Sequence, residues 1–142
     1  MKLQTASSVI SLAKELENKT AGFYEDLAER YAGGKDSFLA FAAENKKYVV
    51  QIERAYYGVI SDAIEGCFAF DLDSDDYAVE TALAGDAGQA EAVKRATMLE
   101  ETMVRFYTDA AEQSQSLMAD VPRAFMLIVK KRNGRLAKLG AL

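Results

Sequence analysis

Apolar residues recur along most of the chain at intervals of three and four, the spacing of one buried face of an α-helix. This pattern predicts four long helices, and Gly33 and Gly34 end the first of them. Asp36 or Ser37 is the predicted N-cap of the second helix, and Pro122 fits the first turn of the fourth. The predicted helices cover residues 3–32, 36–66, 88–118 and 120–139.

The links between these helices predict the topology. The first and third links are short, so each joins two helices into an antiparallel hairpin. The second link spans residues 66–88 and predicts a crossover along the bundle, with a short helix at 75–84. Its acidic run does not fit a calcium loop, because the sixth position is Asp76 instead of Gly and the twelfth is Ala82 instead of Glu. We therefore expect one all-α domain, residues 1–142, forming a four-helix bundle.

The two predicted hairpins resemble each other in sequence. Residues 16–29 (LENKTAGFYEDLAE) and 99–112 (LEETMVRFYTDAAE) are identical at seven of fourteen positions. After an offset of one loop residue, residues 40–54 and 124–138 share an Ala-Phe pair and a Lys-Lys pair. We interpret the chain as a duplicated helical hairpin.

Each predicted helix carries one polar residue among apolar helical neighbours. These residues are Glu17, Asn45, Glu100 and Arg132. An unpaired carboxylate in a core costs several kcal/mol or takes up a proton. A metal ion, a shared proton or the guanidinium of Arg132 would compensate the two glutamates. The alternative is that these side chains lie at the edges of the apolar faces and reach water.

The absence of histidine removes whole classes of chemistry. No Ser-His or Cys-His nucleophile pair is available, and any metal would need oxygen ligands. Cys67 is the only cysteine, so an internal disulfide and a rubredoxin domain are both excluded, and a reducing cytoplasm is the expected location. The first 20 residues alternate charged and apolar side chains, unlike a signal peptide.

The charge balance is acidic, with a net charge of −5. Lysine and arginine are scattered apart from the run KKRNGR at 130–135. This distribution disfavours a nucleic-acid or membrane partner.

With these features, the chain resembles the rubrerythrin-like branch of the ferritin-like superfamily. The resemblance covers nearly the whole length and includes a repeated Glu-x5-Phe-Tyr signature that begins at Glu17 and at Glu100. It implies a ferritin-like bundle that dimerises. In that family the first helix of each hairpin supplies a Glu and the second supplies Glu-x-x-His, which together bind two irons.

Carried over to this chain, the resemblance keeps Glu17 and Glu100 but loses the other iron ligands. The first Glu-x-x-His falls on Asn45 and Tyr48, and the second falls on Val129 and Arg132. These six residues are interpreted as a degenerate diiron site. A shifted register, Glu44-x-x-Lys47, would restore one carboxylate but places it on a more exposed face.

The leading hypothesis is a non-catalytic bundle that serves as a structural or protein-interaction subunit, with no cofactor and with a homodimer as the expected assembly. The alternative is a residual metalloprotein that holds one hard cation, manganese or iron between Glu17 and Glu100, with oxygens of Asn45 or Tyr48. Its ancestry would be a peroxide-related oxidoreductase.

A third hypothesis is a small-molecule binder that uses the space left by the irons. That cavity would be lined by Tyr24, Tyr48 and Tyr107. Under the leading hypothesis, Arg132 pairs with Glu17, Glu100 or both, because arginine stays protonated and its planar fork matches a carboxylate. Asn45 and Tyr48 are then expected to donate to whichever carboxylate oxygen lacks a partner.

Overall fold

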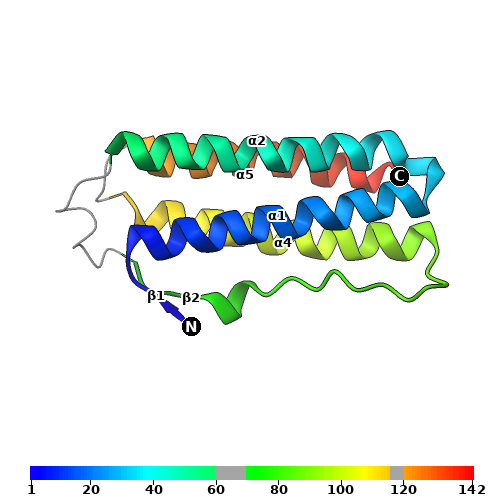
Figure 1. Cartoon of the computed structure of the whole chain (residues 1–142), viewed down its shortest axis with the longest axis horizontal. Helices are drawn as coiled ribbons and strands as arrows, with labels where there is room; N and C mark the ends of the chain where they lie inside the picture. The colour runs from blue at the N-terminus through cyan, green and yellow to red at the C-terminus, as the bar shows by residue number, and fades with distance from the viewer. Residues whose placement is uncertain (60–69, 116–119) are drawn as a thin grey trace.

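The computed structural model describes residues 1–59, 70–115 and 120–142, with the side chain of Val59 left out. Within these ranges the protein is a bundle of four long helices, as predicted (Figure 1). The helices are α1 (Ala6–Arg30), α2 (Lys35–Val59), α4 (Gln89–Gln113) and α5 (Asp120–Gly140). The predicted parts of helices at 60–66 and 116–118, and Cys67, lie outside the described residues.

Helix α1 begins three residues later than the sequence pattern predicts. Thr5 and Ser8 form a reciprocal capping box, in which each hydroxyl accepts a hydrogen bond from the other's backbone N–H. The residues before the cap form strand β1 (Lys2–Leu3), which pairs antiparallel with β2 (Leu72–Asp73). The amphipathic pattern alone does not reveal this, because the partner strand lies about 70 residues away.

The first hairpin turns through a 3-10 helix at Ala32–Gly34. Helix α2 then begins at Lys35, so Asp36 lies in its first turn instead of capping it. Helix α5 begins at Asp120, as predicted.

The predicted long crossover is present and runs along the outside of α1 and α4 from one end of the bundle to the other (Figure 1). The short helix expected in it is only a 3-10 turn, Ser74–Tyr77, and residues 78–88 have no helix. Side chains of α1 and α4 hold the crossover by its carbonyl groups. Lys19 donates to Val79 O at 2.9 Å, and Arg105 donates to Asp76 O at 2.7 Å.

Aromatic side chains form much of the core between the helices. Phe41 and Phe125 are each 1% exposed, as their positions on the apolar faces predict. The ring of Tyr24 lies edge-on to Phe41, and the ring of Tyr107 lies 5.7 Å from Phe125. Both tyrosine rings are buried by these contacts, so their hydroxyl groups can reach only buried partners.

Candidate functional site

Two carboxylates and a guanidinium meet in the middle of the bundle. Glu17 on α1, Glu100 on α4 and Arg132 on α5 are all 0% exposed. Arg132 Nη1 donates to Glu100 Oε2 at 2.6 Å, and its Nη2 donates to Glu17 Oε1. The ion pair expected between Arg132 and both glutamates is therefore present, and one guanidinium bridges the two hairpins.

Two tyrosine hydroxyls also donate hydrogen bonds to the carboxylates, each to the glutamate of the other helix. Tyr107 on α4 donates to Glu17 Oε1 on α1 at 2.8 Å. Tyr24 on α1 donates to Glu100 Oε1 on α4 at 2.7 Å. In each helix the tyrosine lies seven residues after the glutamate, or two turns along the same face, but each tyrosine serves the glutamate of the other helix.

A second buried guanidinium, that of Arg135, was not predicted. Its Nη1 donates to Glu100 Oε1 at 2.9 Å and to Asn45 Oδ1 at 2.6 Å, and its Nη2 donates to Phe41 O at 3.2 Å. The signal that could have identified it is its spacing. Arg135 follows Arg132 by three residues, which places both arginines on one face of α5.

The expected roles of Asn45 and Tyr48 are wrong. Both are buried, as predicted, but neither donates a hydrogen bond to Glu17 or Glu100. Asn45 Nδ2 donates to Thr20 Oγ1 at 2.7 Å, and Tyr48 donates to Glu44 Oε2 at 3.0 Å. The carboxylates instead receive their hydrogen bonds from two other tyrosines and two arginines.

The sequence pattern placed Glu44 on a more exposed face, but this residue also contacts the buried cluster. Its side chain is 34% exposed and lies 3.6 Å from Arg135 Nη2. It therefore links the buried cluster to the edge of the bundle. Glu101, which follows the buried Glu100, is exposed.

The pKa values of the two buried glutamates shift in opposite directions. Burial raises the pKa of Glu17 above its ordinary value, and Arg132 and Tyr107 offset this only in part. Burial also opposes ionisation of Glu100, but Arg132 and Arg135 together outweigh it and lower the pKa of this residue. Consistent with this difference, Glu17 Oε2 has no hydrogen-bond partner among the described residues. The negative charge of Glu100 is therefore stabilised more strongly than that of Glu17.

The guanidinium groups also lie against aromatic rings. The Cζ atom of Arg132 is 5.3 Å from the ring centre of Tyr48 and 5.9 Å from that of Tyr107. The Cζ atom of Arg135 is 5.4 Å from the ring centre of Tyr24. A ligand placed among the three tyrosines would have to displace an ion-paired arginine, so the geometry does not favour the small-molecule hypothesis.

The residues at this site do not fit a pair of iron ions. Such a centre needs four carboxylates and two imidazoles in the family pattern, whereas the aligned positions offer two carboxylates, one amide, one phenol, one alkyl group and one cation. Val129 is buried and carries no donor atom. The guanidinium of Arg132 binds both carboxylates directly. In the described part of the chain, no group of three or more Asp, Glu, Cys or His side chains is arranged to hold a metal ion.

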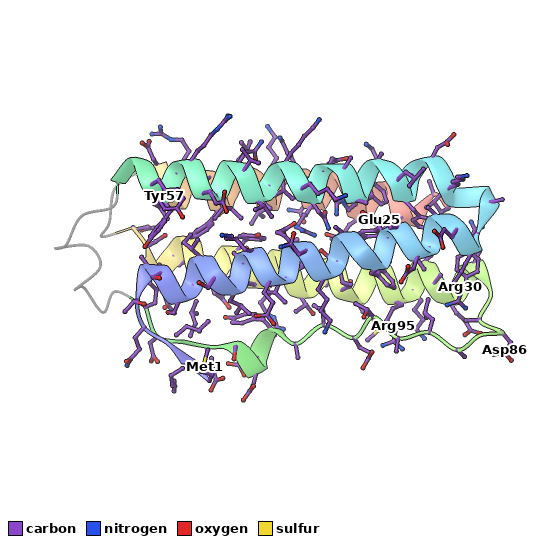
Figure 2. All side chains as sticks on the ribbon, viewed as in Figure 1. Met1, Glu25, Arg30, Tyr57, Asp86 and Arg95 are labelled. Atoms are coloured by element: carbon purple, nitrogen blue, oxygen red, sulfur yellow. The ribbon has the colours of Figure 1, made fainter. Side chains whose placement is uncertain are left out.

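Figure 2 shows side chains in the space between the helices of the bundle. Comparisons of the chain with protein-family models, with curated proteins and with solved structures gave no match. No described helix is long and apolar enough to cross a membrane.

Proposed function

We propose that the protein is a non-catalytic, rubrerythrin-like bundle whose diiron site has been replaced by an ion-pair cluster, and that it serves as a structural or protein-interaction subunit. One observation carries this proposal. The guanidinium of Arg132 bridges Glu17 and Glu100, the two glutamates that the family resemblance assigns to iron. A fixed cation there supplies the positive charge that a metal would otherwise supply.

The crossed tyrosine contacts support the proposed duplication. If the two hairpins are copies, Tyr24 and Tyr107 are equivalent residues, and so are Glu17 and Glu100. The tyrosine–glutamate hydrogen bonds of 2.7 and 2.8 Å are then equivalent contacts, one made by the tyrosine of each copy. Ferritin-like ancestry explains this exchange, since such bundles place equivalent glutamates of the two halves opposite each other.

Metal analysis of protein purified without an affinity tag tests the proposal. We expect far less than one iron or manganese per chain, and an unfolding temperature that neither added metal nor chelator changes, because Arg132 and Arg135 already pair with the two carboxylates. Stoichiometric iron or manganese, with a lower unfolding temperature in chelator, would favour the metalloprotein alternative instead.

A variant with restored ligands makes this test two-sided. It combines Asn45→Glu, Tyr48→His, Val129→Glu and Arg132→His, with Arg135→Met to release Glu100. If the alignment is right, this variant gains metal binding and is stabilised by the metal. The matched control carries Gln instead of Glu at positions 45 and 129, which keeps size but removes the charge. A folded variant that binds no more metal than its control would show the alignment to be wrong.

A further inference from the structure

The outer side of α2 and α5 is basic, although the protein has a net charge of −5. From Val121 to Gly140, α5 contains six lysine or arginine residues and no acidic residue. Two of the six, Arg132 and Arg135, are buried in the ion-pair cluster. We use the term basic face for five of the exposed cations on α2 and α5, namely Lys47, Arg54, Lys130, Lys131 and Lys138.

Helix geometry brings these cations together. On α2, Glu44, Lys47 and Arg54 follow one another at helical spacing, and on α5 Lys131 and Lys138 lie two turns apart. The two rows lie on helices that pack against each other. Arg135 reaches Glu44 from across the helix interface, and the ammonium of Lys131 lies 5.9 Å from the ring centre of Tyr48. In Figure 2, nitrogen-tipped side chains project outward along the α2 side of the bundle.

The contacts between the helices also give the length of the basic face. Arg132 lies against Tyr48, and Arg135 lies against Asn45. Lys138, about one turn further, is therefore level with Ala42. From there to Arg54 is 12 residues, or roughly 18 Å at 1.5 Å per residue.

The basic face is not neutralised by the chain itself. Within the described residues, none of its five cations forms an ion pair. The nearby carboxylates are already used, since Glu53 pairs with Lys14 at 2.7 Å and Glu44 contacts Arg135. These five unpaired charges on an acidic protein therefore leave an attractive field for an anionic partner.

Apolar side chains accompany the cations. Leu127 lies one turn before Lys131 on the same side of α5 and is 45% exposed. Val50, between Lys47 and Arg54 along α2, is 44% exposed. A surface that combines spaced cations with large apolar groups fits an amphipathic segment better than a uniform row of phosphates.

We propose that the basic face binds an acidic, amphipathic helical segment of a partner protein. This inference rests on the proposed function as an interaction subunit, for which it names the chemistry of the partner. Nucleic acid fits less well, because duplex binding commonly uses about 6–10 phosphate contacts and the net charge of the protein opposes a polyanion. Of the four cations in KKRNGR, only Lys130 and Lys131 are exposed.

Binding of a synthetic helical peptide tests the proposal. The probe has about 14 residues, long enough to span the face, with glutamates on one side and leucines between them. Fluorescence anisotropy at low salt gives its Kd. In the variant Lys47→Glu/Lys131→Glu we expect the Kd to rise about tenfold, because two attractions become repulsions. Leu127→Asn should also weaken binding of this peptide but not of polyglutamate.

The matched control is Lys35→Glu/Lys94→Glu, which changes the net charge equally at exposed lysines outside the basic face. This control should change the Kd by less than about twofold. Equal effects of the two double variants would overturn the proposal. Tighter binding of a 15-base-pair DNA duplex or of phosphatidylserine vesicles, lost in the basic-face variant, would also overturn it, because the surface would then recognise phosphate.

The same protein samples are analysed for metal, which separates the two proposals. Absence of peptide binding in metal-free protein overturns the basic-face inference and leaves the ion-pair cluster in place. Stoichiometric metal with peptide binding retained overturns the proposed function and leaves the basic face intact.

Discussion

Replacing Arg132 by Met tests the buried cluster most directly. The substitution keeps the approximate volume but removes the cation that donates to both glutamates. Its effects on them are unequal. Glu100 keeps Arg135 and Tyr24 as donors, whereas Glu17 keeps only Tyr107. The cost therefore falls mainly on Glu17, which is 0% exposed and already has one oxygen without a partner.

The expected loss of unfolding free energy is about 3–5 kcal/mol, the range for breaking one side of a buried ion pair. This is a large part of the roughly 5–15 kcal/mol that stabilises a typical domain. For a chain of 142 residues it corresponds to a fall of roughly 10–15 °C in unfolding temperature. Urea denaturation at neutral pH, followed by circular dichroism at 222 nm, measures the change.

Two double variants identify where the cost arises. Arg132→Met with Glu17→Gln should recover more than half of the lost stability, because no isolated charge then remains at position 17. Arg132→Met with Glu100→Gln should recover much less, because Arg135 then loses its buried carboxylate. Equal recovery in the two doubles, or a loss below about 1 kcal/mol in Arg132→Met, would refute this account of the cluster.

Two further predictions concern pH and the tyrosines. Because the pKa of Glu100 is lowered in the folded state, its contribution is present above the ordinary value of 4.5 and is lost as pH falls through the lowered value. The raised pKa of Glu17 has the opposite sign, so its contribution is present below 4.5 and is lost as pH rises through the raised value. Urea midpoints measured between about pH 3 and 8 follow the stability as a function of pH. Glu100→Gln should reduce the loss of stability at acidic pH, and Glu17→Gln should reduce the loss of stability as pH rises above 4.5. Unchanged slopes of stability against pH would contradict the assignment. Tyr107→Phe should lower the free energy of unfolding by about 1–3 kcal/mol, and Tyr24→Phe by only about 1 kcal/mol. The reason is that Glu17 has one other donor and Glu100 has two. A larger loss in Tyr24→Phe than in Tyr107→Phe would contradict this ranking.

The pattern of apolar and polar residues predicted the bundle and its buried charges because both depend on the inward face of each individual helix. Apolar periodicity locates an inward face, and any charge on that face must be compensated. Glu17, Glu100 and Arg132 were identified in this way, and the pairing followed from their charges. The crossover was predicted because the second link is too long for a turn.

The remaining contacts depend on which helices pack together and on how far each helix is shifted along its neighbour. The reach of Arg135 to Phe41 O and Asn45 depends on how α5 is set against α2, which no single-helix pattern encodes. The donors to the carboxylates were missed for the same reason. The spacing of Tyr24 and Tyr107 from the glutamates shows only that they share a face, and the crossing between hairpins arises when α1 and α4 are packed together.

The crossed tyrosine contacts mean that neither hairpin is complete by itself. With only α1 and α2 assembled, Glu17 would lack Tyr107 and Arg132, and the hydroxyl of Tyr24 would lack its acceptor. The same holds for α4, since Glu100 takes one of its donors from α1. The second hairpin still supplies Glu100 with both arginines, so the first hairpin loses more of its contacts when the halves are apart. Burial of Glu17 is therefore offset only when the two halves pack together, and the polar centre couples them in this way.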